Sequence, residues 1–276
     1  MTLIQSIVLG FTQGLTEFLP VSSSGHLRLV PFLLGWPEHP LYFDVALHLG
    51  TSLAVIIYFR KLWFDFIKSF FIDLNEMIFG YGIKNFATDK LRPQTKRLIT
   101  IFVVSIPVAI IGYVVEKKFE SFLNSPTLIA WSLLIFSAVM FYADKFGAKN
   151  SKEKLTFWDS LFISLSQTLA LVPGVSRSGA TISTGLFRGL SRYSASEFSF
   201  LLSTPIILGA GILKADEIFL AGNDSINVMI GILVSFLSGF VAISFMLKFL
   251  KTNSLNIFIV YRIIIALVLF FVIGKL

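Results

Sequence analysis

The chain has 276 residues, of which 55% are hydrophobic and only 14% are charged, and its mean hydropathy is +0.81. Soluble domains are usually about one quarter charged, so this composition excludes a soluble globular enzyme. The absence of cysteine excludes disulfides and thiolate chemistry. The net charge of +7 comes from cations between apolar runs, which is typical of membrane topology rather than of nucleic-acid binding.

Ten apolar segments follow one another along the chain, and several have the roughly 17–22 residues needed to cross about 30 Å of hydrocarbon. Segments 20–34 and 173–190 are short and are interrupted by Pro, Gly and Ser. Irregular backbone at membrane depth must be buried in protein or line a watery cavity. We therefore expect 2–34 and 157–190 to form hairpins that enter and leave on one side. The segments are 2–19, 20–34, 41–59, 98–115, 127–143, 157–172, 173–190, 197–213, 226–247 and 256–273.

The fold predicted from these segments is an all-α polytopic membrane protein with six transmembrane spans and two re-entrant helical hairpins. It forms a single membrane domain over residues 1–276. This arrangement places 16 Lys and Arg residues in the loops of one face and 4 in the loops of the other. The positive-inside rule then puts the first face in the cytoplasm and both termini outside. The cation-rich loops are 60–97, 144–156, 188–196 and 248–255.

The segment 60–97 differs from the others because it mixes aromatic residues with Lys and Arg. Two interpretations are open: the segment either forms an amphipathic helix at the membrane interface or is a solvated connector. We assign no chemistry to it.

An internal repeat relates the two hairpins. Residues 6–25 align with 160–179 at a constant shift of 154, without a gap and with seven identities. Chance similarity between apolar stretches is the alternative, but the polar matches argue against it. Each half holds one hairpin and three spans, so the second half starts on the opposite face. We predict an inverted-topology repeat, 1–143 and 154–276, whose hairpins meet tip to tip inside the membrane. The polar matches are Gln13/Gln167, Ser22/Ser176, Ser24/Ser178 and Gly25/Gly179.

Polar residues gather at the break of the first hairpin. Gln13 and Glu17 are spaced i, i+4 and share a helix face. Glu17 is an ionisable group in an apolar stretch, which is a functional hypothesis by default; a buried structural acid is the alternative. Pro20 ends the helix, and the Ser and Gly residues after it favour a new helix N-terminus, which suits a phosphate. His26 follows the break and either approaches Glu17 around the turn or is structural.

The second hairpin carries Arg177 in the motif PGVSRSGAT, where the first hairpin has Ser23. A guanidinium at this depth needs an anion. A carboxylate such as Glu17 is one candidate, and a bound phosphate, whose oxygens match the planar fork, is the other. The phosphate interpretation also explains the small and hydroxyl residues around it: Gly174, Ser176, Ser178, Gly179 and Thr181.

Other polar residues carry weaker signals. Asp44 and His48 share a helix face, and either lines the same cavity or is structural. Glu197 and Arg262 are expected to be structural, as members of intramembrane pairs or as helix-end anchors. His39 lies in a loop and is expected to be exposed.

At these motifs the sequence resembles the bacterial undecaprenyl-diphosphate phosphatase family of the bacitracin-resistance type. That family shows (E/Q)xxxE, PVSS(S/T)GH and PGxSRSG, which stand here as QGLTE at 13–17, PVSSSGH at 20–26 and PGVSRSG at 173–179. The stretch FDVALHLGT, the length and the order of spans are also similar, so the resemblance covers the whole chain. Gln13 replaces the first Glu of the acidic form of the motif and cannot act as a base. Glu17 is therefore the residue of this motif that is expected to act as the base.

The resemblance implies hydrolysis of a C55 polyprenyl diphosphate to the monophosphate carrier of peptidoglycan synthesis, and with it bacitracin resistance. It also implies a divalent cation, Mg²⁺ or Ca²⁺, and an active site on the periplasmic or outer side of the bacterial cytoplasmic membrane. The expected partners are the lipid substrate and membrane lipid, without nucleic acid, and a homodimer stays open.

The expected catalytic residues are Glu17, Ser23, His26 and Arg177, with Glu17 also holding the cation. Ser23 is the candidate nucleophile, with His26 or Glu17 as its base. A water oriented by Glu17 and His26 is the alternative. The expected substrate-binding residues are Gln13, Ser22, Ser24, Gly25, Ser176, Ser178, Gly179 and Thr181.

The competing function is a secondary transporter or polyprenyl-phosphate flippase, because inverted repeats with broken hairpins are the architecture of many transporters. The combination of Ser, His, Glu and Arg on two hairpins favours an enzyme, since a transporter needs only binding groups.

Overall fold

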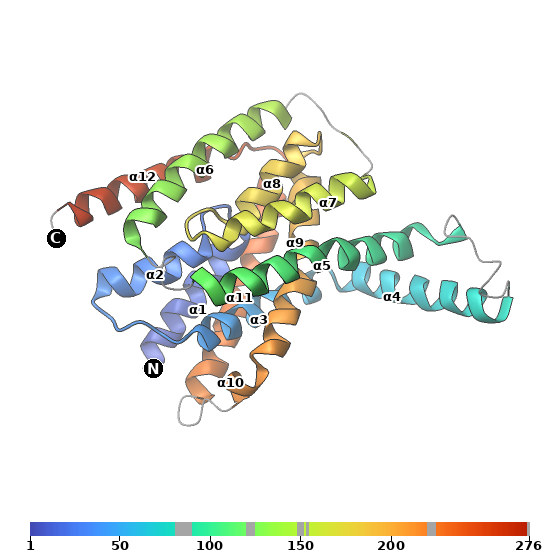
Figure 1. Ribbon diagram of the computed structural model, residues 1–276, viewed down its shortest axis with the longest axis horizontal. Helices are drawn as coiled ribbons and strands as arrows, with labels where there is room; N and C mark the ends of the chain where they lie inside the picture. The colour runs from blue at the N-terminus through green and yellow to red at the C-terminus, as the bar shows by residue number, and fades with distance from the viewer. Residues whose placement is uncertain (81–89, 120–124, 148–151, 153–154, 220–224, 275–276) are drawn as a thin grey trace.

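The computed structural model describes residues 1–80, 90–119, 125–147, 152, 155–219 and 225–274 (Figure 1). Within these residues the regular structure is helical, with one isolated bridge between Lys152 and Leu190. Six helices in the described part of the chain are long and apolar enough to cross a membrane, which confirms an all-α polytopic membrane protein. They are α3 (Leu41–Tyr58), α5 (Pro93–Phe119), α6 (Pro126–Gly147), α9 (Arg192–Leu213), α11 (Ser225–Phe249) and α12 (Asn256–Ile273).

Two hairpins of shorter helices lie where the sequence predicts them. The first joins α1 to α2, and the second joins α7, through a short 3-10 helix, to α8 (Figure 1). Each of these helices has fewer residues than any of the six candidate spans. The bounds are α1 (Leu3–Phe18), α2 (Ser23–Leu34), α7 (Phe157–Ser166), the 3-10 helix (Gln167–Leu171) and α8 (Arg177–Phe187).

The two hairpin breaks share an unusual backbone. Ser22 and Ser176 have φ values of 77° and 76°, a region that residues other than glycine rarely adopt. Each serine is the N-cap of the following helix and accepts a hydrogen bond from the amide three residues on, at 3.2 Å and 3.1 Å. Thr2 and Thr156 likewise form capping boxes at the starts of α1 and α7. Both pairs lie 154 residues apart, so the sequence repeat extends to local structure. The inverted orientation of the halves stays a prediction.

Small residues bring α1 and α11 almost into backbone contact. A Cβ added to Gly14 would lie 1.9 Å from Ser238 Oγ, and one added to Gly10 would lie 2.7 Å from the carbonyl oxygen of Gly231. At the end of α1, the Phe18 ring packs edge-on against Phe200 with centroids 5.0 Å apart. Such close approach is typical of helix packing in membranes, and it fixes the part of α1 that carries Glu17.

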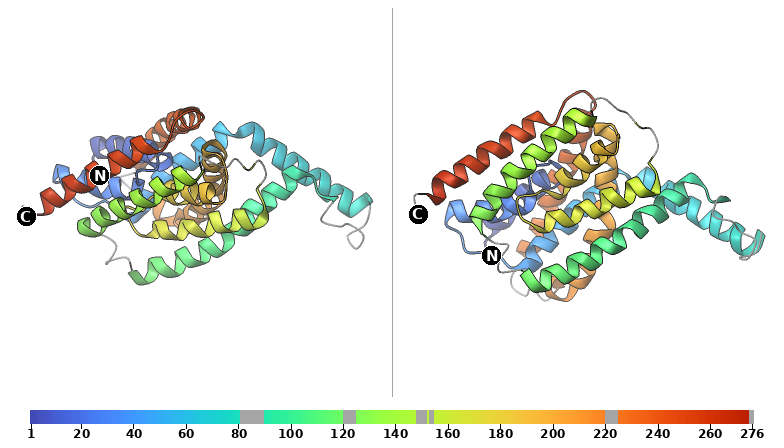
Figure 2. Two further views of the ribbon diagram at one scale, coloured as in Figure 1. Left: turned by 90° about the horizontal axis from the view of Figure 1, so that it is seen from above. Right: turned by 45° about the horizontal axis from the view of Figure 1, so that its top comes forward.

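A helical arm formed by α4 (Arg60–Asn75) and the start of α5 extends away from the other helices (Figures 1 and 2). Arg92 joins its two helices by donating hydrogen bonds to Asp73 and, at 2.8 Å, to Glu76. A π-helical turn (Glu76–Gly80) follows α4. Within 60–97, residues 60–80 and 93–97 are thus helical, as the first interpretation expects, and residues 81–89 lie outside the described part. Its place at the membrane interface stays a prediction.

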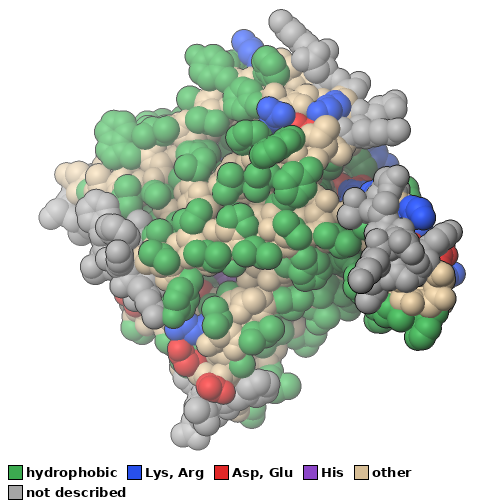
Figure 3. Space-filling view, turned by 45° about the vertical axis from the view of Figure 1, so that its right-hand side comes forward, with side chains coloured by type: hydrophobic (Ala, Val, Ile, Leu, Met, Phe, Trp, Pro, Cys, Tyr) green, Lys and Arg blue, Asp and Glu red, His purple; other side chains and the backbone are tan. Residues whose placement is uncertain are grey.

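Apolar side chains cover most of the face seen in Figure 3, with charged side chains near its margins. Several charged residues form ion pairs near helix ends. Asp144 accepts two hydrogen bonds from Arg192, at 2.5 Å and 3.0 Å, and Glu197 accepts one from Arg97 at 2.7 Å. Glu197 is therefore a pair member, as expected. The short helix α10 (Ala215–Phe219) lies between α9 and α11.

Asp159 closes the open end of the second hairpin. It is fully buried at the start of α7 and accepts a hydrogen bond of 2.8 Å from Arg188, just beyond α8, and another from Lys152. Burial alone would raise the pKa of Asp159, but hydrogen bonds from Lys152, Thr156 and Arg188 outweigh it and hold the pKa below its ordinary value.

Candidate active site between the two hairpin breaks

The two hairpin breaks contact each other directly. The backbone N–H of Gly174 donates to Ser22 Oγ at 3.1 Å, and Ser178 Oγ donates to the carbonyl oxygen of Leu19 at 3.1 Å. Each bond runs from the second break to the first. The predicted tip-to-tip contact is therefore confirmed.

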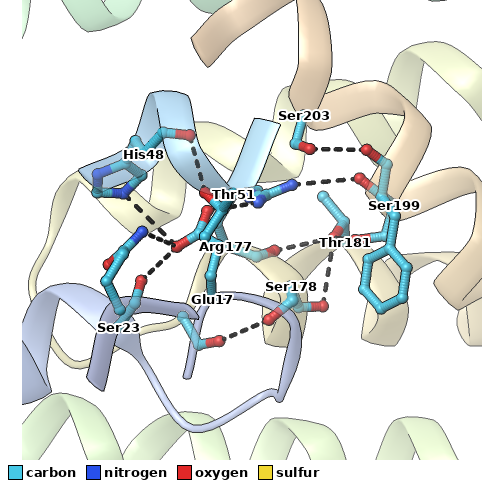
Figure 4. A network of polar contacts seen from close by, with 12 residues as sticks. Glu17, Ser23, His48, Thr51, Arg177, Ser178, Thr181, Ser199 and Ser203 are labelled. Carbon is cyan, nitrogen blue, oxygen red and sulfur yellow. Dashed lines mark hydrogen bonds and ion pairs between the residues drawn. The ribbon is translucent and has the colours of Figure 1, made fainter. Parts of the chain in front are cut away.

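Glu17 is the centre of the polar network at this junction (Figure 4). Its side chain is 4% exposed. Its Oε1 accepts from Arg177 Nη2 at 2.6 Å, while its Oε2 accepts from Ser23 Oγ at 2.6 Å and from Gln13 Nε2 at 3.0 Å. A buried carboxylate is stable only when a cation and hydrogen bonds compensate its desolvation. The structure thus brings together four residues that the sequence predicted for the site.

Arg177 begins α8 and is held on both sides. Besides the bond to Glu17, its Nη1 donates to the carbonyl oxygen of Ser199 at 3.2 Å. Thr181 Oγ1 contacts the carbonyl oxygen of Arg177 at 2.8 Å and Ser199 Oγ at 2.6 Å, which ties α8 to α9 (Figure 4). The carboxylate partner, one of the two interpretations of Arg177, is present. The direct contact of Thr181 with substrate stays a prediction.

His48 on α3 also faces the Glu17 carboxylate, with Nε2 3.5 Å from Oε2 (Figure 4). Its Nδ1 donates to the carbonyl oxygen of Asp44 at 2.7 Å, because a carbonyl can only accept. His48 thus lies at the same junction as Glu17, as the first of its two interpretations expects.

Asp44 turns to a different set of partners. It contacts His39 Nε2 at 2.5 Å and accepts from Arg28 Nη2 at 3.5 Å. The prediction that His39 is exposed is wrong, because Asp44 holds the imidazole where only 8% of His39 is exposed.

His26 turns away from the Glu17 centre. Its Nδ1 donates to the carbonyl oxygen of Ser22 at 2.7 Å, and its Nε2 accepts from the Tyr261 hydroxyl at 2.7 Å. The two rings are stacked with centroids 5.7 Å apart. Both ring nitrogens of His26 are thus engaged elsewhere, and Glu17 is the candidate base that contacts Ser23.

The serines and glycines predicted to bind substrate shape the starts of α2 and α8. Ser22 Oγ lies 3.4 Å from Ser24 Oγ, and Ser176 Oγ lies 3.2 Å from Ser178 Oγ. The cap serines engage the amides of Gly25 and Gly179. The N–H groups at the first positions of each helix have no partner within the helix, which leaves two helix N-termini at the junction.

Two side-chain oxygens at the junction, from Gln13 and Glu17, are candidate ligands for a hard divalent cation. Gln13 Oε1 is buried and has no hydrogen-bond partner among the described residues, and it belongs to the amide bonded to Glu17. The described residues include no group of three or more His, Asp or Glu that could hold a metal. One carboxylate and one amide oxygen suit a cation that keeps waters and binds phosphate, as Mg²⁺ does.

Sequence reasoning missed Ser199 and Tyr261 as neighbours of the site and left Arg262 as a structural residue. Ser199 has a signal in the sequence, because Ser196, Ser199 and Ser203 recur on one face of an apolar segment. The contacts of Tyr261 and Arg262 depend on how α12 packs, and spacing within the chain carries no signal for them.

These features define a class: a polytopic helical membrane protein with a carboxylate–hydroxyl–guanidinium site between two broken hairpins. A family model described as bacitracin resistance protein BacA matches residues 6–268. The chain is similar to proteins named undecaprenyl-diphosphatase. It is 42% identical over 268 residues to the one of Moorella thermoacetica, with 96% of each chain covered. For that of Geobacter sulfurreducens the identity is 42% over 270 residues, again with 96% of each covered. The chain belongs to the BacA family.

Proposed function

We propose that this chain hydrolyses undecaprenyl diphosphate to undecaprenyl phosphate and inorganic phosphate in the bacterial cytoplasmic membrane. The observation that carries the proposal is the contact of Ser23 and Arg177 with one buried carboxylate, Glu17. The relatives named undecaprenyl-diphosphatase support the phosphatase over a transporter or flippase. The reaction returns the lipid carrier to peptidoglycan synthesis and confers bacitracin resistance.

The proposed nucleophile is Ser23 and its base is Glu17. Ser23 Oγ already donates to Glu17 Oε2 at 2.6 Å, and a hydroxyl needs such a neighbour to attack. The oxygen attacks the terminal phosphorus as its proton passes to Glu17, and the bond to the bridging oxygen breaks. Undecaprenyl phosphate leaves. Water then cleaves the phosphoserine, regenerating the hydroxyl and releasing inorganic phosphate. A water that attacks directly, oriented by Glu17, is the alternative.

Arg177 is proposed to hold the diphosphate. Its planar guanidinium matches phosphate oxygens, and phosphoryl transfer depends mainly on positioning and on neutralising charge. The N-termini of α2 and α8, together with the adjacent hydroxyls, supply further donors. The positions predicted to bind substrate lie in the two breaks, at the starts of α2 and α8, and, for Gln13, on α1.

A divalent cation, Mg²⁺ or Ca²⁺, would be held by Gln13 Oε1 and Glu17. When bound, it would neutralise part of the charge of the diphosphate. The partial donor set leaves positions for water and phosphate oxygens, as expected for a cation shared with the substrate.

The site is proposed to face the periplasm or exterior. This orientation is supported by the excess of Lys and Arg in the loops of the opposite face. The prenyl chain would lie in the bilayer while the diphosphate enters between the hairpins.

The test uses the purified chain in detergent micelles, where no compartments exist, with C55 diphosphate and an assay for inorganic phosphate. Release of phosphate well above a protein-free control is expected. Binding of the lipid without release would contradict the phosphatase and favour the transporter.

A further inference from the structure

Arg262 is the largest side chain that is fully buried among the described residues. It projects from α12, and its partners are carbonyl and hydroxyl oxygens. Its Nη1 donates to the carbonyl oxygen of Pro20 at 3.3 Å and its Nη2 to that of Gly174 at 2.8 Å. Further bonds run from Nε to Ser137 Oγ at 3.2 Å and from Nη2 to the carbonyl oxygen of Leu133 at 3.3 Å.

The two hairpin carbonyls that Arg262 binds are equivalent. Pro20 and Gly174 lie 154 residues apart, which is the shift of the internal repeat. Each lies two residues before the N-cap serine of its break, Ser22 or Ser176. One guanidinium from outside both hairpins therefore holds the same point of each break.

Burying a cation without a carboxylate is costly unless oxygens satisfy its donors. An apolar residue would fill this position on α12 without that cost. What the guanidinium adds is a planar fork that reaches several fixed acceptors at once, which the single ammonium group of Lys cannot reproduce. Arg at this position thus links the two breaks non-covalently, through hydrogen bonds from one side chain to both; we call this link the cross-link.

The neighbouring residue on α12 acts on the same region. The Tyr261 hydroxyl donates to His26 Nε2 at 2.7 Å, and His26 Nδ1 in turn holds the carbonyl oxygen of Ser22. Consecutive residues of α12 thus hold the first turn of α2 and both breaks. Ser23 and Arg177, which follow the two breaks, are placed by this support.

We propose that Arg262 is a positioning residue for phosphate release: it fixes the two hairpin breaks relative to each other so that Ser23 and Arg177 meet at Glu17. The proposal rests on the proposed function for its effect on catalysis. Its effect on the breaks can be measured separately.

The test compares R262K, R262Q and Y261F with the matched control R192K, which alters an ion pair to Asp144 outside the site. In R262K we expect kcat to fall about 10- to 100-fold with KM within about threefold, because a displacement of about 1 Å can cost about 100-fold in rate. In R192K the unfolding temperature falls while kcat stays within about twofold. If R262Q does not fold, the conclusion relies on R262K and Y261F.

Hydrogen exchange of the peptides covering 19–25 and 173–179 supplies the readout that does not require activity. R262K should raise exchange at both breaks by about fivefold or more, whereas R192K should change neither. The proposal would be overturned if R262K left exchange at either break unchanged or kept a kcat within twofold of that of the parent chain. An equal loss of kcat in R192K would also overturn it. A parent chain that releases no phosphate contradicts the proposed function instead, and raised exchange at both breaks would still support the cross-link.

Discussion

Arg177 and Glu17 lie 160 residues apart in the chain and meet at 2.6 Å, between Nη2 and Oε1. The contact joins the start of α8 to the end of α1, so one ion pair connects the two hairpins at the point where Ser23 also binds. The guanidinium of Arg177 compensates the charge of a buried carboxylate. It is also the group proposed to bind the diphosphate.

Replacing either member of this pair should abolish activity. We expect R177A and E17A to lower kcat/KM for phosphate release by about 10³-fold or more, because R177A removes the guanidinium proposed to neutralise the diphosphate and E17A removes the proposed base. R177K keeps the charge but loses the fork, and a loss of about 10²-fold is expected. The control R97K alters the pair with Glu197 and should stay within about threefold. Near-normal turnover of folded R177A would show that Arg177 does not hold phosphate.

Ser23 and Ser24 offer a matched pair for the nucleophile. S23A should reduce kcat by about 10³-fold, because the hydroxyl bonded to Glu17 is lost. S24A should keep kcat within about threefold and raise KM, because Ser24 is predicted to bind substrate and its Oγ contacts Ser22 Oγ at 3.4 Å rather than Glu17. Both are measured as initial rates in micelles. If S23A keeps more than about one tenth of the parent kcat, direct attack by water is supported instead.

Removal of divalent cations should inactivate the chain. Chelation is expected to lower phosphate release at least about tenfold, with recovery on adding Mg²⁺ or Ca²⁺, because the cation is proposed to neutralise part of the diphosphate charge. Q13L removes the Oε1 that has no hydrogen-bond partner in the described part of the chain and should raise the cation concentration for half-maximal activity. Its control is Q167L, at the equivalent position of the second hairpin. Activity that survives thorough chelation would argue against a cation.

The close contact of α1 with α11 predicts a stability effect. G14A should lower the free energy of unfolding by about 1–3 kcal/mol or more, because its Cβ would overlap Ser238 Oγ. G112A on α5 is the control, since a Cβ there meets no atom of the described residues within 4 Å, and it should be neutral or slightly stabilising. Unfolding in detergent, followed by circular dichroism, measures both. Equal stability of the two variants would mean that α1 does not pack this tightly.

The lowered pKa of Asp159 predicts how stability depends on pH. The stabilisation from its hydrogen bonds is complete above the unfolded pKa of about 3.9 and is lost as pH falls through the lower folded pKa. D159N should cost about 2 kcal/mol at pH 7, discounted because Lys152 and Arg188 are about 40% exposed. The cost should be smaller at pH 3. The exposed D216N serves as the control and should change stability by no more than about 0.5 kcal/mol at both pH values.

The sequence by itself determined the class of protein, the six spans and the two breaks. Hydrophobic length and the residues Pro20, Ser22 and Ser176 act locally, so they can be interpreted without knowing which helices touch. The repeat also indicated that Glu17 and Arg177 belong to one junction, because it placed them on equivalent hairpins.

The tertiary structure decided which polar side chains reach that junction. His26 and His48 look alike as polar residues in apolar segments, yet His48 faces Glu17 while His26 binds Tyr261. His39 is buried by Asp44 from the following helix, and Arg262 bridges both breaks from near the C-terminus. These outcomes depend on the rotation and packing of whole helices. Contacts between residues far apart in the chain are fixed by the shapes of the packed surfaces, which spacing along one segment does not encode.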